Sequence, residues 1–461
     1  MMVRYFQEHP ALCSVLIMIL GIIAGHYIDA LPSSFYFLDC LNITHSVAAY
    51  AAVTTLILLP IVAIVIRYRF ISTLLLACCL FLLGIFLIKG ERHTYSVPYG
   101  EQVTAFMDEQ RENLSNIIQQ QGLTEEDYAL VTAVTLGEKQ NLSYETKQEY
   151  SICSASHVLA ISGLHMGIIF LFLSKIVPML ITLISHKYTD KISSFIIIFC
   201  IWTYVLLIGN HPSTMRAAIM LTMYLLTQLF TQYTDKMSIL TFTAGLLLII
   251  YPEWLFDIGF QMSFFAVLAI LYIFIPLSER IHNAFPSSDF TYAPSKSLCD
   301  IHIIYHTKCA LREIALIIID ALLLSIVAEI AVGPLIAYYF GQFSTYFWLT
   351  NLIVPMLTTA CIYLTIFLFI ADGVATLLYF IPFHDSPAAI ITNLLSCVAH
   401  IQNACIHFVS HLPYASFENI NLNLLQMILI YFYIIILAFW VDSHYFCVTL
   451  QTEPKKCEIN Y

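Results

Sequence analysis

The chain has 461 residues, of which 60% are hydrophobic and only 11% are charged, and its formal net charge at pH 7 is −11. Because an average soluble domain is about 45–50% apolar and about 25% charged, this composition excludes a water-soluble globular protein, a disordered chain and a disulfide-rich scaffold. The acidic balance also argues against a strongly basic surface for nucleic acid. The composition predicts an all-α polytopic integral membrane protein.

Apolar stretches long enough to cross a bilayer recur along the whole chain. A spanning helix needs about 20 largely apolar residues, and this criterion predicts about 11 to 12 transmembrane helices. The stretch at 157–184 is long and contains Ser162-Gly163 and Pro178, which predict a broken or re-entrant helix. The predicted spans are 11–27, 46–66, 70–88, 157–184, 192–209, 213–231, 238–251, 258–276, 314–340, 345–370, 388–411 and 424–441.

Lysine and arginine indicate how these spans are oriented, because they accumulate in short cytoplasmic loops. With a cytoplasmic N-terminus and twelve crossings, the outside receives basic residues in one long connection only. The pattern predicts that both termini are cytoplasmic. The cytoplasmic side then holds Arg4, Arg67, Arg69, Lys187, Lys191, Lys236, Arg280, Lys296, Lys308, Arg312, Lys455 and Lys456, which are 12 of the 19 basic residues.

The long outside connection divides the chain into predicted regions: N-terminal transmembrane helices at 1–88, an extracytoplasmic segment at 89–156, a transmembrane core at 157–441 and a cytoplasmic tail at 442–461. Within the second region, apolar residues recur at helical spacing among acidic and amide residues. They predict an amphipathic helix, either lying on the outer leaflet or packed in a small solvated bundle. Its apolar stripe consists of Val103, Phe106, Leu114, Ile117 and Ile118.

A second, shorter helix is predicted after the amphipathic one. Thr124-Glu125-Glu126-Asp127 resembles a capping box that opens a helix, and Gly137 is suited to closing it. Among the 13 cysteines, only Cys40 and Cys153 could meet outside the membrane. The scattered spacing favours small buried hydrophobic residues over a disulfide framework or a metal site.

Ionisable residues inside apolar stretches are informative, because each costs roughly 2.5–3.5 kcal/mol on insertion scales and usually faces a bundle interior or a water-filled path. Arg216 lies about one turn into its span, where it could line such a path or reach the outer headgroups. Glu329 lies in the middle of its span and is predicted to face inward. Asp320, His157 and His165 belong to the same class.

Residues 157–167 concentrate several signals. On one continuous helix, His157 and His165 would lie about 80° apart, on neighbouring sides. Gly163 and Gly167 form a small-xxx-small pair that predicts close helix packing. The two histidines lack the third ligand and the tighter spacing of a zinc site, and Ser162 lacks a nucleophile-elbow motif. We therefore expect no metal, cofactor or catalytic site here.

A polar stripe runs down the otherwise apolar segment 388–411, with spacings that alternate between three and four residues. Such a stripe can line an aqueous passage between helices, or it can mark a helix that lies flat on the membrane. The passage keeps the predicted topology and is preferred. The stripe consists of Asn393, Ser396, His400, Asn403, His407 and Ser410.

Four segments together resemble the ComEC competence protein family, the inner-membrane channel for single-stranded DNA in natural transformation. The first is His157-Val-Leu-Ala-Ile-Ser162-Gly163-Leu-His165, and the second runs from Gly209 to Met220 with Pro212-Ser213 and Arg216-Ala217 in place. The third is Asp257-Ile-Gly259-Phe260-Gln261-Met-Ser263-Phe264. The fourth runs from Pro334 through Phe340-Gly341-Gln342-Phe343 to Asn351 and Pro355. The resemblance covers about residues 125–415. It implies that Arg216 faces the translocation path and compensates either a passing phosphate or an acidic group such as Glu329 or Asp257.

The sequence also departs from that family. Members commonly carry an OB-like domain after the first spans and a metallo-β-lactamase-like nuclease domain, and neither is found in this sequence. The resemblance implies a non-enzymatic channel core in the bacterial inner membrane, with separate DNA receptor, nuclease and cytoplasmic motor proteins. A homo-oligomer is compatible with it.

Two other classes of function remain open on the sequence alone. One is a secondary transporter for a small or lipid-linked anion, although no inverted repeat is visible. The other is an intramembrane hydrolase using Ser162. The predicted residues of the translocation path are His157, Ser162, Gly163, His165, Gly167, Arg216, Asp257, Gln261, Ser263, Glu329, Asn351, His400 and His407.

Overall fold

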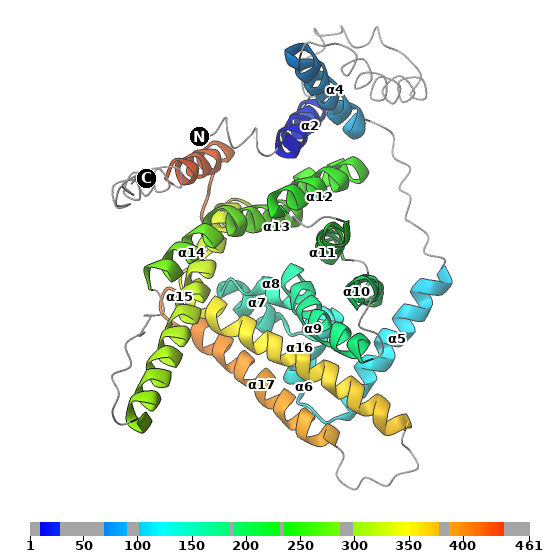
Figure 1. The fold of residues 1–461 in the computed structure, drawn as a ribbon, viewed down its shortest axis with the longest axis vertical. Helices are drawn as coiled ribbons and strands as arrows, with labels where there is room; N and C mark the ends of the chain where they lie inside the picture. Colours follow the sequence, from blue (N-terminus) through cyan, green and yellow to red (C-terminus); the bar gives the residue numbers. More distant parts are fainter. Residues whose placement is uncertain are drawn as a thin grey trace, which may run out of the picture. The chain divides into compact units, whose positions relative to one another are not determined.

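The protein is described from a computed structural model, which covers residues 10–27, 69–89, 101–183, 189–209, 211–230, 235–285, 298–377 and 387–437. This part of the chain is almost entirely helical, and two strands of two residues each are its β-structure (Figure 1). Together with its long apolar helices, this confirms the predicted all-α polytopic membrane protein.

Six helical stretches among the described residues are long and apolar enough to cross a membrane: Gly163–Thr182, Thr189–Leu207, Ile258–Ala284, Ala310–Phe340, Phe347–Val374 and Ala389–Ser410. Four shorter apolar helices accompany them, at Ala11–His26, Ala77–Ile88, Lys236–Ile250 and Leu424–Leu437. The predicted span at 213–231 forms a helix but is not among these ten, and the predicted span at 46–66 lies outside the described residues.

The chain folds into two compact units, each built from several stretches of sequence. The first consists of residues 1–123, 135–137 and 161–264, and the second of residues 124–134, 138–160 and 265–461. The helix α13 (Ile258–Ala269) passes from the first unit into the second after Phe264.

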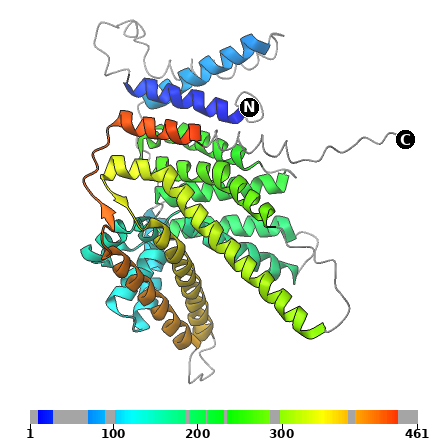
Figure 2. The same cartoon turned by 90° about the vertical axis from the view of Figure 1, so that its left-hand side faces the viewer.

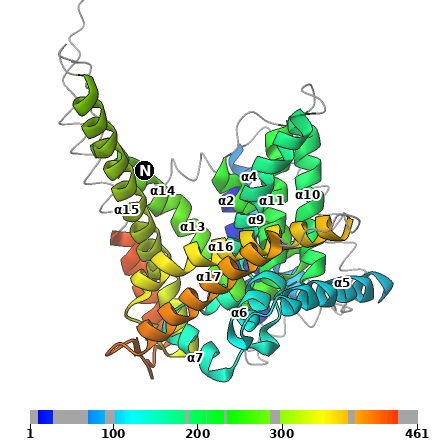
Figure 3. The same ribbon diagram turned by 90° about the horizontal axis from the view of Figure 1, so that it is seen from below.

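The first unit contains α2 (Pro10–Tyr27), α4 (Arg69–Lys89), α5 (Glu101–Gln120), α9 (Gly163–Thr182), α10 (Thr189–Leu207), α11 (Pro212–Phe230), α12 (Lys236–Ile250) and the 3-10 turn η5 (Pro252–Phe256). Helices α9, α10 and α11 lie side by side (Figure 3). Their shared core includes Met166, Ile201 and Ala218, which are all fully buried. Helices that must bury an apolar stripe against one another pack in this way.

Helices α2 and α4 pack against each other more tightly than the others in the first unit. A Cβ atom at Gly21 would overlap the backbone of Phe81, and one at Gly84 would overlap the backbone of Met18. Backbones approach this closely only where small residues face each other, as in membrane helix pairs. Glycines therefore set the distance between these two helices.

The predicted amphipathic helix is confirmed as α5. Ile118 in its C-terminal half is fully buried, whereas Val103 and Phe106 near its start are 41% and 54% exposed. Helix α5 packs against α10, and only part of its apolar stripe is buried within the unit. The predicted position of α5 at the outer leaflet stays a prediction.

The second unit contains most of α6 (Glu125–Leu136), then η4 (Lys139–Asn141), α7 (Tyr144–Ile152), α8 (Ser156–Leu159), the π-helical turn η6 (Ile270–Phe274), α14 (Ile275–Ala284), α15 (Leu298–Phe340), α16 (Phe347–Leu377) and α17 (Pro387–Ser410). Helices α16 and α17 run alongside each other (Figure 3). The strands β1 (Phe343–Ser344) and β2 (Ser416–Phe417) pair antiparallel, with Phe343 opposite Phe417, and are the short arrows in Figure 2.

The predicted short helix is confirmed as α6. The Thr124 hydroxyl accepts the backbone N–H of Asp127 at 3.2 Å, which is the N-terminal half of the expected cap. Gly137 follows the last helical residue with a φ of +80°, a conformation that favours glycine. Local sequence signals thus set both ends of this helix.

Candidate functional site

The chain breaks its helix at the first motif. Helix α8 ends at Leu159 and α9 begins at Gly163, with Ser162 as its N-cap. The Ser162 hydroxyl accepts the N–H of Leu164 at 3.3 Å, and the Ser162 N–H donates to Nδ1 of His165 at 3.2 Å. This reciprocal arrangement satisfies N–H groups that a helix start leaves open. The predicted break at Ser162-Gly163 is confirmed.

Two related predictions are wrong. His157 and His165 do not share one helix, because the non-helical residues between Leu159 and Gly163 place them on α8 and α9. Pro178 does not interrupt the span, because α9 continues through it to Thr182. Adjacent helices and local adjustments accommodate proline in membrane helices.

The Ser162–His165 pair has a structural explanation. Its Oγ and Nδ1 atoms lie 3.1 Å apart, a distance at which a nucleophile and a base could also meet. However, the hydroxyl accepts a backbone N–H, and His165 is completely buried in the first turn of α9. The spacing of the two residues is therefore that of a capping box.

The second motif contacts the first at this break. The Ser213 hydroxyl donates to the carbonyl oxygen of Ile161 at 2.7 Å, which fastens the start of α11 to the residue before the α9 cap. A Cβ atom at Gly163 would lie 3.7 Å from the Cβ of Ala217, in ordinary van der Waals contact. The starts of α9 and α11 therefore lie together, and Gly163 is at their contact.

Gly167 does not take part in this packing. No atom of the described residues lies within 4 Å of the position that its Cβ would occupy. The prediction of close packing is therefore wrong for Gly167, although it lies one turn from Gly163 on the same helix. Only Gly163 in this pair adjoins a neighbouring helix.

Arg216 belongs to the second motif and is the charged centre of this region. Its side chain is buried, with an overall residue exposure of 2%. Nη1 lies 3.8 Å from Oδ1 of Asp257 in the third motif. Within the described residues, neither Nε nor Nη1 of Arg216 has a hydrogen-bond partner. A buried guanidinium normally makes several such bonds, so this one retains unused donors.

Asp257 has a double role in this arrangement. Its Oδ1 accepts the N–H of Phe260 at 2.7 Å, capping the start of α13, while its side chain is 49% exposed. A Cβ atom at Gly259 would lie 3.2 Å from Asp257 Oδ1 and 3.3 Å from Arg216 Nη2. The glycine therefore leaves room for the ion pair. Gln261 donates from Nε2 to the carbonyl oxygen of Leu255 at 2.9 Å.

Three helix starts are joined in the region that contains Arg216. The contacts of Ser213 with Ile161 and of Arg216 with Asp257 join the starts of α9, α11 and α13. Each N-terminus carries about half an elementary positive charge. With the guanidinium, these dipoles outweigh the single Asp257 carboxylate, so the region is suited to an anion. Ser263, in the second turn of α13, is half-buried.

The second unit contains the remaining path candidates. Glu329 on α15 is 7% exposed, which confirms that it faces inward, and it accepts a long hydrogen bond of 3.5 Å from the Ser154 hydroxyl. His157 is exposed, with Nδ1 3.0 Å from the carbonyl oxygen of Ser154. Asn351 is half-buried on α16. Ser154 thus links α15 to the loop before α8.

The fourth motif is joined to the end of α7. Gln342 donates from Nε2 to the Ser151 hydroxyl at 2.8 Å. The preceding Gly341 has a φ of +65°, and its carbonyl oxygen accepts the N–H of Ile420 at 2.8 Å. The turn after α15 is therefore held between α7 and the segment that follows α17.

The polar stripe on α17 makes contacts that the sequence did not predict. Ser396 donates to Asp127 Oδ2 at 3.1 Å, and Asn403 accepts from the hydroxyl of Tyr150 at 3.2 Å. His407 Nδ1 lies 2.7 Å from Glu149 Oε1. Three stripe residues are therefore bound to α6 and α7 within this unit, whereas the sequence indicated either a passage lining or a flat membrane helix.

Two further residues that the sequence singled out, His400 and Asp320, also lie in the second unit. His400 on α17 is exposed. Asp320 on α15 accepts a hydrogen bond from the Ser278 hydroxyl at 2.7 Å and lies 2.8 Å from His282 Nε2, so its carboxyl group is held by two side chains of α14. Sequence reasoning missed Asp127, Glu149 and Tyr150 as partners of the stripe. Helical spacing identifies a polar face but not the segment that covers it.

Comparison with known proteins adds to this geometry. The family model described as "Competence protein" matches residues 134–444, which include all four motifs. The chain belongs to the competence protein family. ComE operon protein 3 of Bacillus subtilis is 26% identical over 233 residues, covering 50% of this chain and 25% of that protein. An uncharacterized protein of Aquifex aeolicus is 31% identical over 146 residues, covering 32% of this chain and 33% of its own length.

The chain aligns with only part of the length of each of these relatives. The alignments span about a quarter and a third of the two relatives' own lengths. No solved structure matches the chain. The region that matches the family model, residues 134–444, contains both Arg216 and Glu329.

Proposed function

We propose that this chain forms the membrane core of a channel that carries single-stranded DNA across the bacterial inner membrane during natural transformation. Membership of the competence protein family supports the proposal, as does the similarity to ComE operon protein 3. The chain contributes no hydrolytic step in this proposal. DNA capture, strand degradation and the driving force come from separate receptor, nuclease and motor proteins.

The observation that carries the proposal is that Arg216 is buried and that two of its nitrogen atoms have no hydrogen-bond partner among the described residues. A buried guanidinium with unused donors, 3.8 Å from a half-exposed carboxylate, can exchange that carboxylate for a passing phosphate. Arginine donors match the oxygens of either group. Because Asp257 competes for the same donors, a phosphate is held weakly and can leave, as conduction requires.

The helix N-termini beside Arg216 contribute in the same direction. The dipoles of α9, α11 and α13 favour a negative charge at their starts, and they do so without side chains that would bind the phosphate permanently. A chain with a net charge of −11 repels DNA overall. Attraction confined to one region therefore suits a narrow path.

Loss of the gene in a transformable host is the direct test. Labelled duplex DNA is offered to wild-type cells, to the deletion strain and to that strain complemented with the wild-type chain. We expect the deletion to abolish entry of label into the cytoplasm while binding at the cell surface persists. Normal entry in the deletion strain would refute the proposal.

The same strains separate the proposal from transport of a small anion. Uptake of labelled DNA is compared with growth and envelope integrity in medium without DNA. A DNA channel predicts loss of uptake with unchanged growth, because its substrate is absent. A growth defect together with normal DNA entry would instead indicate an anion transporter.

A further inference from the structure

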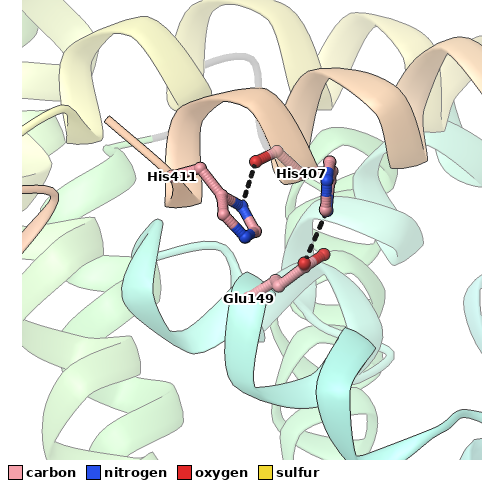
Figure 4. A group of neighbouring side chains, drawn as sticks. All are labelled: Glu149, His407 and His411. Atoms are coloured by element: carbon pink, nitrogen blue, oxygen red, sulfur yellow. Dashed lines mark hydrogen bonds and ion pairs between the residues drawn. The ribbon is translucent and has the colours of Figure 1, made fainter. Parts of the chain in front are cut away.

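Three metal-ligating side chains meet at the C-terminal end of α17. His407 and His411 lie one turn apart on the same side of that end, and Glu149 on α7 faces them both (Figure 4). One ligand atom from each residue lies within 4.8 Å of the other two. All three residues belong to the second unit, so the geometry is that of one compact body.

The ring of His411 is held in an orientation typical of a metal ligand. Its Nδ1 lies 2.8 Å from the carbonyl oxygen of His407 and 3.1 Å from the Ser410 hydroxyl. A donor bond from Nδ1–H to a backbone carbonyl leaves Nε2 with its lone pair free to bind a metal. The end of α17 therefore sets the tautomer of His411 before any metal arrives.

Glu149 and His407 are close enough to share a cation. Glu149 Oε1 lies 2.7 Å from His407 Nδ1, which is a hydrogen-bond distance. Two ligands on a tetrahedral zinc, each about 2.1 Å from the metal, lie roughly 3.4 Å apart. Replacing the shared proton by a metal therefore needs only a small side-chain movement, since His407 and Glu149 are 65% and 23% exposed.

We propose that Glu149, His407 and His411 form a binding site for a divalent transition metal ion, of which zinc is the representative. Two imidazoles and one carboxylate form a ligand set that zinc uses, with water completing the tetrahedron. Hard cations such as Mg²⁺ and Ca²⁺ prefer all-oxygen sites, so they compete poorly here. This site departs from the sequence-based expectation of no metal.

Metal binding would join α7 to α17 beside contacts that already connect them. Tyr150 bonds to Asn403 and to Gln402, and the Cys153 thiol lies 3.6 Å from the carbonyl oxygen of Ile406. The metal would add a bond at the exposed end of this interface. The bound metal would therefore stabilise the contact between α7 and α17. This role is separate from the handling of DNA proposed above.

Zinc binding to the purified full chain in detergent tests the site. Protein stripped with a chelator is dialysed against buffered Zn²⁺ at pH 7.5, where imidazole is largely neutral, and bound zinc is counted per chain. We expect His411→Ala to bind one zinc fewer than the wild type. Because the chain has 16 histidines, the difference between proteins is the decisive quantity.

His400→Ala is the matched control, because His400 is also exposed on α17 but lies outside the cluster. It should bind as much zinc as the wild type. Glu149→Gln retains a hydrogen-bond acceptor for His407 and should weaken zinc binding at least tenfold. Equal zinc content in the wild type and His411→Ala, or wild-type affinity in Glu149→Gln, would overturn the proposal.

A Co²⁺ titration of the wild type gives a second measurement that needs no variant. Tetrahedral Co²⁺ bound by nitrogen and oxygen has a visible absorption band that hexaaquo Co²⁺ lacks at comparable intensity. We expect one equivalent of Co²⁺ to produce this band and Zn²⁺ to remove it. A spectrum unchanged from that of free Co²⁺ would also contradict the site.

Discussion

Arg216 and Asp257 approach each other without forming a hydrogen bond. The 3.8 Å between Nη1 and Oδ1 brings two opposite charges together from motifs that lie on different helices, α11 and the start of α13. Asp257 instead gives Oδ1 to the N–H of Phe260. The pair therefore brings opposite charges together in a buried position and leaves Nε and Nη1 of Arg216 without a hydrogen-bond partner among the described residues.

Substitution of Arg216 tests this arrangement. We expect Arg216→Lys to lower DNA uptake roughly tenfold, equivalent to one charge-assisted hydrogen bond of about 1.5 kcal/mol, because an ammonium cannot replace the planar fork. Arg216→Ala should lose nearly all uptake. Uptake is measured at equal membrane abundance of each variant, and full activity in Arg216→Lys would remove Arg216 from the path.

Gly163 and Gly167 provide a matched pair of substitutions. Leucine at Gly163 adds atoms beyond a Cβ that already lies 3.7 Å from Ala217, whereas leucine at Gly167 meets open space in the described part of the chain. We expect Gly163→Leu to abolish uptake with the protein still in the membrane, and Gly167→Leu to retain most of it. Equal activity of the two variants would show that α9 and α11 do not pack through Gly163.

The hydroxyl of Tyr150 is expected to stabilise the interface of α7 with α17. Tyr150 is fully buried, and its hydroxyl bonds to Asn403 and Gln402. Tyr150→Phe leaves these amides short of a partner at a cost of about 1–3 kcal/mol. Thermal unfolding in detergent should begin a few degrees lower, whereas Tyr144→Phe, on the exposed side of α7, should leave it unchanged.

Tyr150 also predicts how stability depends on alkaline pH. Burial raises its pKa well above the ordinary value of 10, so the folded protein keeps the proton that the unfolded chain loses. Stability from this group is fully present below pH 10 and is lost as the pH rises towards the folded-state pKa. Wild-type protein should therefore lose stability above pH 10 more steeply than Tyr150→Phe in the same denaturation assay.

Cys153 is expected to resist thiol reagents. Burial raises the pKa of its thiol from 9 to about 12, and the thiolate is the reactive form. At pH 8 the thiolate fraction should fall by about 1,000-fold, so maleimide should label Cys153 only after unfolding. Rapid labelling of native protein, detected by mass spectrometry of the peptide, would contradict the burial. Cys40, the disulfide partner considered from the sequence, lies outside the described residues.

Topology can be tested with single added cysteines. The distribution of lysine and arginine predicts that residue 120 is outside and residue 455 is cytoplasmic. Gln120 is exposed at the end of α5, so Gln120→Cys should react with a membrane-impermeant maleimide in intact cells, above the background of the native cysteines. Lys455→Cys should react only after lysis, and the opposite pattern would reverse the arrangement.

Several features of this protein follow from the sequence because they depend on neighbouring residues. Composition determines the membrane class, since apolar stretches of this length need a bilayer. The caps at Thr124, Ser162 and Gly137 act within one helical turn, so short motifs locate them. The burial of Glu329 follows from the cost of a carboxylate facing lipid. Each of these signals is local or compositional.

Only the tertiary structure decided which of these polar residues meet. The stripe on α17 is visible in the sequence, and His407 and His411 have helical i, i+4 spacing, but Glu149 lies 258 residues away from His407. Likewise, the sequence offered both Glu329 and Asp257 as acidic partners for Arg216, and only the fold showed that Arg216 lies beside Asp257. Helical periodicity determines which side chains share a face, whereas packing of distant segments, driven by burial and by the need to pair polar groups, determines what that face contacts.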